Sequence, residues 1–415
     1  MLLYPRVGFG HHLGTIGRKS TIKTEGKRNA ENSQKRSVYA GFRRFPFPQP
    51  TLNHLVRERK ILLFFMIDNL AESVKGKRDN MSILKLEPAF KDYLWGGSRL
   101  VKEYGKEYSG SVLAESWELS CHPDGPSKIV NGPYSGKTLK EYIEAEGANV
   151  LGTNCRRFKD FPVLIKLIDA RQDLSIQVHP DDQYALENEN QYGKTEMWYV
   201  MDAGEDAFLY YGFKQEISRS EFEERIYNDT LPEVLNAVPV KKGDVFFIEA
   251  GTIHAIGKNI LIAEIQQNSN LTYRVYDYGR IGKDGKKREL HIDAALNVTK
   301  RKPIVKHRND YPHMADCDYF TVDKLYMDGK VMKRMEGDVS EGSFVSLLFL
   351  DGNGTVCCID EKRKTAQDRG DIQVSYKKGD SVFLPAKSGR YGIEGSCDVL
   401  VTTIREKSGN SEDSV

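Results

Sequence analysis

Hydrophobic and polar residues alternate in short runs along most of the chain after Met81, and turn-forming residues separate these runs. Runs rich in β-branched and aromatic residues, bounded by Gly, Asn and Asp, are typical of β-strands. We expect strands at residues 208–211, 245–248, 260–265 and 271–276. The pattern therefore predicts a mainly β protein.

Helical patterns are fewer. Thr138 is a suitable N-cap for a helix at residues 139–146, and the Ser-x-x-Glu motif from Ser220 to Glu223 predicts a second helix at 220–226. Residues 290–298 are a third candidate. These helices are short interruptions in a chain whose pattern otherwise favours strands.

One segment occurs twice. Residues 241–250 resemble residues 377–386 at an offset of 136, and in each copy a Gly-Asp pair precedes an apolar strand. Two such units fit two related jelly-roll barrels, an arrangement that protects the edges of β-sheets. At the same offset His254 aligns with Arg390. We therefore expect the second barrel to lack this histidine, to bind no metal and to be structural.

The charge of the chain is divided unevenly. The formal net charge of the whole chain is +2. Residues 1–80 contain 16 Lys and Arg and 6 Asp and Glu, so the rest of the chain contains 45 Lys and Arg and 53 Asp and Glu and is acidic. Nucleic-acid binding depends on clustered Lys and Arg, so the acidic remainder argues against it. We interpret residues 1–80 as a disordered or spurious extension before a native start at Met81. The alternative is a basic targeting or interaction arm.

The apolar runs and the cysteines indicate in which cellular compartment the protein is expected. The longest apolar run, residues 61–67, is far shorter than the roughly 20 residues that a membrane span needs, so no membrane segment is predicted. None of the six cysteines forms a Cys-x-x-Cys pair. This usage predicts reduced thiols in a cytoplasmic protein.

Four residues form a candidate metal site. Gln177 and His179 alternate with apolar residues, so they share one face of a predicted strand. Glu196 begins another apolar strand, and His254 follows a strand and a Gly turn. Nitrogen and oxygen ligands without thiolate suit zinc, with Mn and Fe(II) left open. The alternative is two core histidines and an unrelated glutamate.

Two cations accompany these candidates. Arg274 follows a cluster of amide side chains, and arginine is the preferred partner of oxyanions because its planar fork supplies paired donors. Lys194 precedes Glu196 by two residues, so an extended chain would give both the same face. The alternatives are a surface arginine paired with Asp277 and a solvated loop lysine.

The ordered motifs resemble those of the type I mannose-6-phosphate isomerases, in particular the shorter bacterial form. The resemblance runs from Met81 to about Glu406 and rests on residues 90–97, 118–120, 131–133, 173–182, 193–196, 251–255 and 264–278. It implies a cupin fold with a small helical insertion near 214–237. It also implies one zinc ion per chain, held by Gln177, His179, Glu196 and His254.

The resemblance further implies an enzyme that interconverts mannose 6-phosphate and fructose 6-phosphate through an enediol. Arg274 matches the catalytic arginine of the family, and Lys194 matches a lysine near the substrate. Trp95, Lys194 and Arg274 are then expected to bind the sugar phosphate. Glu264 is our first candidate for the base, ahead of Lys194 and a water at the metal.

This reading predicts a catalytic domain at residues 81–310, a second, metal-free cupin-like domain at 311–406 and a flexible tail at 407–415. We expect a monomer or a weak homo-oligomer. The competing hypotheses are a non-catalytic phosphosugar-binding cupin, an isomerase for another sugar phosphate and an Fe(II) dioxygenase.

Overall fold

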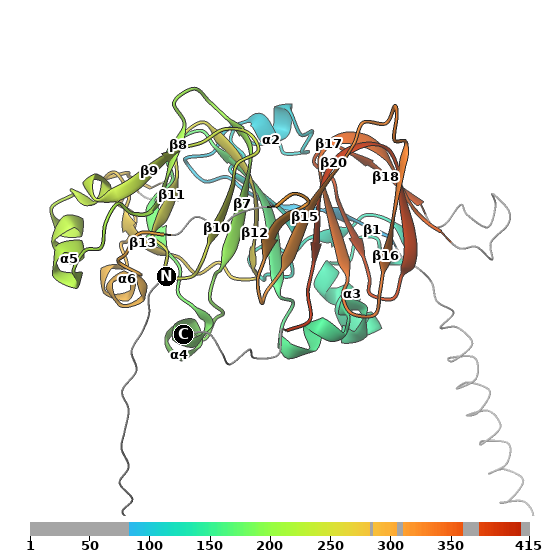
Figure 1. Cartoon of the computed structure of the whole chain (residues 1–415), viewed down its shortest axis with the longest axis horizontal. Helices are drawn as coiled ribbons and strands as arrows, with labels where there is room; N and C mark the ends of the chain where they lie inside the picture. The colour runs from blue at the N-terminus through green and yellow to red at the C-terminus, as the bar shows by residue number, and fades with distance from the viewer. Residues whose placement is uncertain (1–82, 283–284, 305–309, 360–372, 408–415) are drawn as a thin grey trace, which may run out of the picture. The chain divides into compact units, whose positions relative to one another are not determined.

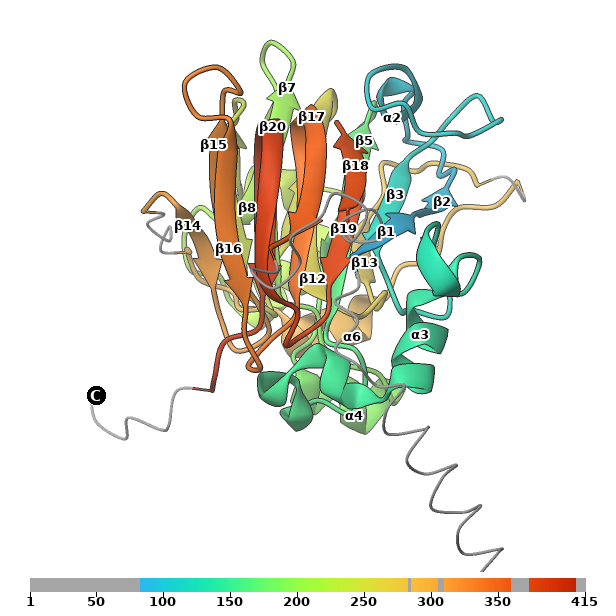
Figure 2. The same ribbon diagram turned by 90° about the vertical axis from the view of Figure 1, so that its right-hand side faces the viewer.

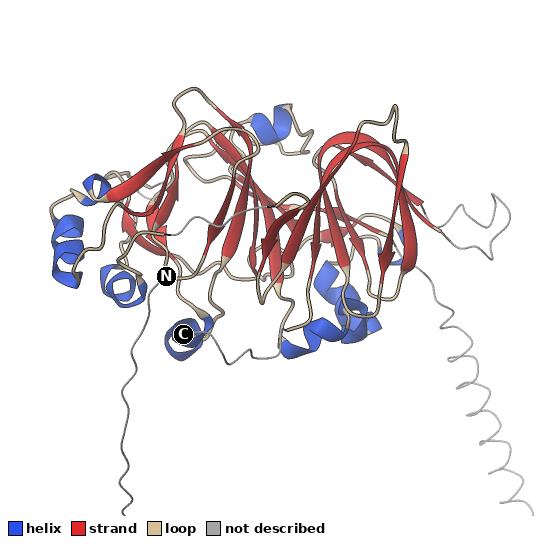
Figure 3. Cartoon of the chain, viewed as in Figure 1, coloured by secondary structure: helices blue, strands red, loops and turns tan. Residues whose placement is uncertain are grey.

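Strands dominate the described part of the chain, and short helices lie at their ends (Figure 3). The computed structural model describes residues 83–282, 285–304, 310–359 and 373–407. All of them belong to one unit, Gly76–Val415. The expectations for residues 1–80 and for most of the tail lie outside the described residues. The predicted mainly β, cupin-type fold is confirmed.

The first half of the described chain forms two sheets. The larger one has six strands in the order β10 (Val245–Ile248), β7 (Glu196–Ala203), β12 (Ile260–Gln267), β5 (Val163–Ala170), β3 (Glu115–Leu119) and β2 (Ala89–Lys91). The smaller one has five, in the order β13 (Tyr273–Tyr276), β6 (Ile176–Val178), β11 (His254–Ile256), β8 (Phe208–Phe213) and β9 (Leu235–Pro239). The strands predicted at 208–211, 245–248, 260–265 and 271–276 correspond to β8, β10, β12 and β13.

A third sheet of nine strands forms the other half. Its central path is β14 (His313–Asp316), β15 (Thr321–Met327), β20 (Gly389–Thr403), β17 (Val345–Cys358), β19 (Ser381–Leu384), β1 (Leu84–Glu87) and β4 (Lys128–Ile129). Strands β16 (Arg334–Val339) and β18 (Gln373–Lys377) pair with β20 and β17. In Figure 2, β15, β20 and β17 run side by side.

Helices connect these strands. They are α2 (Arg99–Lys102), α3 (Leu139–Glu146), α4 (Asp182–Glu189), α5 (Arg219–Tyr227) and α6 (Ile292–Val298), with short 3₁₀ turns at Gly132–Tyr134, Ala148–Leu151, Thr153–Arg157 and Leu231–Glu233. The helix predicted at 139–146 is α3, and Thr138 caps it. Among the described residues, no helix is both long enough and apolar enough to cross a membrane.

The N-cap predicted for the second helix is wrong. Ser218, not Ser220, caps α5, because its hydroxyl accepts a hydrogen bond from the Glu221 backbone N–H at 3.0 Å. The Ser-x-x-Glu pattern occurs twice in this segment, two residues apart, and the helix uses the earlier copy. The third helix, α6, begins at Ile292 rather than at residue 290.

The sheets pack as layers with apolar clusters between them (Figure 1). Along β7, Met197, Tyr199 and Met201 pack toward the nine-stranded sheet, whereas Trp198 and Val200 pack toward the five-stranded sheet. Successive side chains of a strand point to opposite faces, so a strand between two layers has both faces buried. The six-stranded sheet is therefore the central layer.

The strand β1 does not follow the predicted domain division. It lies at the start of the range predicted as the catalytic domain, yet it pairs antiparallel with β19, with Leu84 opposite Phe383. Leu84 and Leu86 are both buried. The first described strand thus completes the sheet that was assigned to the second domain.

The internal repeat has the same local structure in both copies. In residues 241–244 and 377–380 the first backbone N–H donates to the carboxylate of the fourth residue at 2.9 Å. The glycine of each turn has a positive φ, +94° and +88°, which favours glycine at this position. The turns lead into β10 and β19. Each copy therefore begins an equivalent strand in its own sheet.

The interior of the second barrel is apolar. Leu347, Phe349, Val382 and Val399 belong to one buried cluster there. Arg390, which aligns with His254, is exposed, and its guanidinium donates to the Glu336 carboxylate at 2.6 Å. The side chain that replaces the histidine therefore points away from this core.

A stability prediction follows from the contact between the two halves. The fully buried ring of Phe344 lies 5.1 Å from that of Phe383 and 5.4 Å from that of Phe161. We expect Phe344→Ala to lower the free energy of unfolding by about 3–5 kcal/mol, since it leaves a cavity in this core. Urea unfolding measures the change, with Val331→Ala as control because Val331 is 93% exposed. Equal stability of the two variants would contradict this packing.

Candidate active site

A row of three side chains crosses the five-stranded sheet. His254 on β11 and Arg274 on β13 are both direct partners of Gln177 on β6, which lies between them. Residues directly opposite each other on antiparallel strands point to the same face. Adjacent strands are about 4.8 Å apart, so Arg274 lies one strand from Gln177 and two from His254. The row faces the central sheet.

The central sheet presents carboxylates to this row. Glu196 begins β7 on the same face as Trp198, and Glu264 on β12 is the partner of Trp198 in the ladder. Gln266, two residues further along β12, is the partner of Glu196. Alternation along two fully buried strands thus directs both carboxylates into the space between the sheets.

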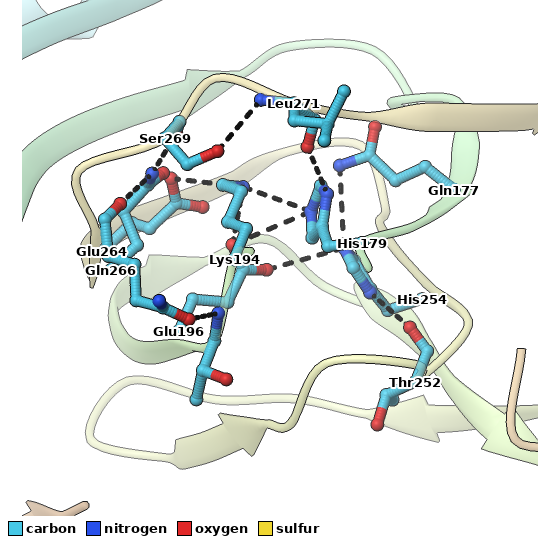
Figure 4. Close-up of polar contacts among 12 residues, drawn as sticks. Gln177, His179, Lys194, Glu196, Thr252, His254, Glu264, Gln266, Ser269 and Leu271 are labelled. Atoms are coloured by element: carbon cyan, nitrogen blue, oxygen red, sulfur yellow. Dashed lines mark hydrogen bonds and ion pairs between the residues drawn. The ribbon is translucent and has the colours of Figure 1, made fainter. Parts of the chain in front are cut away.

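Two histidines and a glutamate converge there (Figure 4). Glu196 Oε1 lies 3.3 Å from His254 Nε2, and Glu196 Oε2 lies 3.7 Å from His179 Nε2. One ligand atom from each residue lies within 4.8 Å of those of the other two, and all three residues are buried. Among the described residues, this is the group of His, Cys, Asp or Glu side chains that could hold a metal ion.

Backbone carbonyls orient both imidazoles. His179 Nδ1 lies 2.8 Å from the Leu271 carbonyl oxygen, and His254 Nδ1 lies 2.9 Å from that of Thr252. A carbonyl only accepts, so each Nδ1 donates and each Nε2 keeps its lone pair for the site. Burial lowers the pKa of His254 to about 3 and that of His179 well below its usual value. Both rings are therefore neutral, the form that binds metals.

The Glu196 carboxylate fits a cation. The residue is fully buried, its Oε2 is ion-paired with Lys194 Nζ at 2.5 Å, and its Oε1 accepts no hydrogen bond from the described residues. Burial raises the pKa of Glu196 to about 7, in spite of the neighbouring Lys194. A buried carboxylate oxygen that accepts no hydrogen bond is costly unless a positive charge compensates it. The donor set of one carboxylate and two imidazoles therefore suits a divalent metal.

Gln177, the fourth predicted ligand, lies beside this group. Its Nε2 is 3.5 Å from His254 Nε2. The oxygen and nitrogen of a side-chain amide exchange places by a half-turn about the last bond. That rotation would direct Oε1, the atom that can bind a metal, toward the group.

Lys194 lies in the same group, as its spacing from Glu196 predicts. Its Nζ is 2.5 Å from Glu196 Oε2, 3.0 Å from His179 Nε2 and 3.9 Å from Glu264 Oε1. Hydrogen bonds fix the backbone on both sides of the residue: Lys194 N–H donates to the Pro180 carbonyl at 3.0 Å, and Thr195 N–H donates to a Gln267 side-chain oxygen at 2.8 Å. The alternative of a solvated loop lysine is excluded, since Lys194 is 4% exposed.

One cavity adjoins the group. It has a volume of about 250 Å³, and the predicted residues Trp95, Gln177, Lys194, Glu264 and Arg274 all line it. Trp95 is buried and its ring lies 5.6 Å from that of Tyr93. The structure therefore brings the predicted catalytic and substrate-binding residues around one space, beside the group of His179, Glu196 and His254.

Arg274 is not the partner of Asp277. The Asp277 carboxylate accepts hydrogen bonds from Arg280 and Arg288 instead. Arg274 donates from Nη1 to the Glu289 carbonyl at 2.9 Å, while its buried Nε has no partner among the described residues. The guanidinium thus keeps donors available to a ligand in the cavity.

Lys166 is a residue of the site that no sequence motif indicated. This lysine lies on β5, 4% exposed, with its Nζ 3.1 Å from Glu264 Oε1 and 3.8 Å from Glu115 Oε2. Burial alone would raise the pKa of Glu264, but Lys166 and Lys194 outweigh it and hold that pKa at about 2. The sequence does contain a signal for this residue, because Lys166 is the one charged residue in the apolar run 163–168. A lysine that is buried within such a strand requires an acidic partner.

Comparison with known proteins agrees with this geometry. The model of the phosphomannose isomerase type I catalytic domain matches residues 83–205. The probable mannose-6-phosphate isomerase GmuF of Bacillus subtilis is 36% identical over 332 residues, which are 77% of this chain and 98% of the relative. The mannose-6-phosphate isomerase of Streptococcus mutans is 36% identical over 324 residues, 75% and 95% of the two chains.

A solved structure is similar over the same span. The mannose 6-phosphate isomerase from Bacillus subtilis superposes with a TM-score of 0.69 at 35% identity, and the match covers 77% of this chain and 99% of the other. A relative that is aligned over nearly its whole length at this identity shares the fold and the family. The chain therefore belongs to the family of type I phosphomannose isomerases.

Proposed function

We propose that the protein is a zinc-dependent aldose–ketose isomerase that interconverts mannose 6-phosphate and fructose 6-phosphate. The observation that carries this proposal is the buried group of His179, Glu196 and His254 beside a cavity lined by both a carboxylate and cations. The names of the relatives support the same substrate pair.

The metal would be held by His179, Glu196 and His254, with Gln177 Oε1 as the fourth ligand. Imidazole and carboxylate ligands without thiolate are typical of zinc sites that keep a position for substrate. When bound, the metal supplies a Lewis acid that polarises substrate oxygens and stabilises the negative charge of an enediol.

The base is assigned to Glu264, which removes the C2 proton of mannose 6-phosphate, exchanges it with solvent and delivers a proton to C1. The flanking lysines keep this carboxylate ionised, so it has no proton to lose first. The same lysines lower the pKa of Glu264 and so make it a weaker base, which means that the C2 proton must be acidified by polarisation of the adjacent carbonyl. Trp198 Nε1 donates to Glu264 Oε2 at 3.0 Å and holds the carboxylate in place.

Lys194 and Arg274 supply positive charge to the substrate. The Lys194 ammonium lies between the carboxylates of Glu196 and Glu264, where it can donate to an oxygen on C1 or C2. Arg274 lies in the row with Gln177 on the opposite wall and can add electrostatic stabilisation in a site shielded from water. Trp95 forms an apolar wall for the sugar.

We also assign residues 81–310 to a catalytic domain and 311–406 to a supporting one, with β1 lying in the sheet of the latter. A cytoplasmic location is part of the proposal. All six cysteines lie in described residues and no disulfide joins them, which supports a reducing compartment.

The proposed function is tested by a coupled assay on mannose 6-phosphate. We expect turnover that disappears after treatment with a chelator and returns when zinc is added, because substrate polarisation requires the metal. Adding manganese or iron in parallel tests the choice of metal. Full turnover by protein shown by elemental analysis to contain no metal would overturn the proposal.

The ligand assignment predicts the behaviour of histidine variants. His179→Ala and His254→Ala are expected to lose bound zinc, measured by elemental analysis after dialysis, since each removes one of three converging ligands. His313→Ala is the control, because this histidine lies on β14 with a side chain 70% exposed. Zinc at full stoichiometry in either site variant would show that the ligand set is wrong.

Lys194→Met separates substrate chemistry from metal binding. We expect turnover to fall by about a hundredfold or more, as is common when a donor to a developing oxyanion is removed. Zinc content should stay the same or rise, because an ammonium next to the ligands repels a cation. A variant that loses its zinc would instead make Lys194 part of the structure of the metal site.

A further inference from the structure

The cavity has a second arginine, Arg288, which no predicted motif includes. It lies in the segment that follows β13, where Ile281 and Lys287 form an isolated antiparallel bridge. Arg288 lines the cavity together with Arg274. The carbonyl that accepts the hydrogen bond from Arg274 Nη1 belongs to the next residue, Glu289, so the two arginines are neighbours.

Asp277 holds Arg288 in a fixed position. Arg288 Nε donates to Asp277 Oδ2 at 2.7 Å, and its Nη2 donates to Oδ1. Nη1 has no hydrogen-bond partner among the described residues. The same carboxylate binds Arg280, whose Nη1 also donates to the Asp173 carbonyl. Such a clamp orders the guanidinium before any ligand arrives, which lowers the entropic cost of binding.

This end of the cavity has more positive than negative charge. Arg274 and Arg288 line it, and Arg280 lies next to it on Asp277; these three positive charges are set against one negative charge, that of the buried Asp277. Glu289 is exposed, so water screens its carboxylate. Burial lowers the pKa of Arg274, and the neighbouring Arg288 lowers it further, as expected for cations without a matching anion. The excess of about two charges matches a phosphate dianion.

At the metal end of the cavity, acidic side chains neutralise the positive charges. The two lysines there already contact acids: Lys194 lies 2.5 Å from Glu196, and Lys166 lies 3.1 Å from Glu264 and 3.8 Å from Glu115. Their charges are neutralised by three buried carboxylates. A phosphate placed at that end would meet those carboxylates, so the lysines are poorly suited to anchor it.

Strand order separates the two ends. Arg274 lies on β13, the edge strand of the five-stranded sheet, while Gln177 and His254 lie on the next two strands. His291 N–H donates to the Arg274 carbonyl, so the segment that carries Arg288 runs along the outer edge of β13, on the side away from β6 and the metal ligands. In a hexose 6-phosphate the phosphate is at the opposite end of the carbon chain from C1 and C2. A substrate with its C1–C2 end at the metal therefore directs its phosphate toward the arginines.

We propose that Arg288, held by Asp277, anchors the phosphate of the substrate and makes the site selective for phosphorylated sugars. Because Nε and one hydrogen of Nη2 bind Asp277, Nη1 and the second hydrogen of Nη2 are the paired donors left for phosphate oxygens, with Arg274 beside them, and a lysine cannot reproduce this arrangement. The proposal deepens the isomerase function above and rests on it for the identity of the sugar. The phosphate subsite itself can be measured without turnover.

Steady-state kinetics of Arg288→Gln test this role. We expect KM for mannose 6-phosphate to rise by about ten- to a hundredfold, the loss typical of a hydrogen-bonded charge pair, while kcat changes little. Arg288→Lys should recover part of the affinity, since it restores the charge without the fork. Lys287→Gln is the matched control because it removes the same charge from an exposed neighbour outside the cavity. An unchanged KM in Arg288→Gln, or a loss confined to kcat, would overturn the proposal.

Binding of inorganic phosphate gives an independent readout. We expect calorimetry to show phosphate binding to the zinc-loaded wild-type protein and to Lys287→Gln, and binding at least tenfold weaker to Arg288→Gln. Zinc content and thermal unfolding of each variant check that the fold is intact. If the wild type fails to isomerise mannose 6-phosphate but shows this pattern, the isomerase proposal fails and the subsite stands. Equal phosphate binding by wild type and Arg288→Gln would remove the subsite.

Discussion

The buried carboxylate of Glu196 is the constraint on which the site depends. It is fully buried, is paired with Lys194 at Oε2 but accepts no hydrogen bond at Oε1 from the described residues, and faces two neutral imidazoles. Such a group is tolerated only where positive charge reaches it, and here Lys194 and a metal are the available sources. The remaining polar residues of the cavity follow from this arrangement. Glu264 is kept ionised by the lysines that surround it, and the arginines that share the single buried carboxylate of Asp277 lie at the other end of the cavity, together with Arg274.

The need to hold Glu196 in place also explains why a second barrel packs against the central sheet. Glu196 and Trp198 face the cavity from β7, so Met197 and Tyr199 on the same strand must face the other way. The nine-stranded sheet buries that second face and makes the strand rigid on both sides. Its own interior is filled by apolar side chains, and β1 closes it from the beginning of the described chain. We therefore interpret it as a support that fixes the carboxylate-bearing strands.

Sequence could predict the parts of the site that follow from alternation. Gln177 and His179 share a strand face, and Lys194 shares one with Glu196, because a side-chain period of two is a local property. The pairing of β1 with β19 could not be predicted, since no local pattern reports a partner some 300 residues away. Arg288 was missed for the same reason, because only the fold brings it to the cavity. Ser218 was missed because two equivalent capping motifs overlap.

The exchange of the C2 proton with solvent is the most direct measurement of metal-dependent isomerisation. Zinc-loaded protein in D₂O should convert mannose 6-phosphate to fructose 6-phosphate and introduce deuterium at the carbon that receives the proton, followed by NMR. Protein stripped of metal should do neither, and zinc should restore both. Binding of mannose 6-phosphate without conversion or exchange, or equal rates with and without metal, would contradict the proposed function.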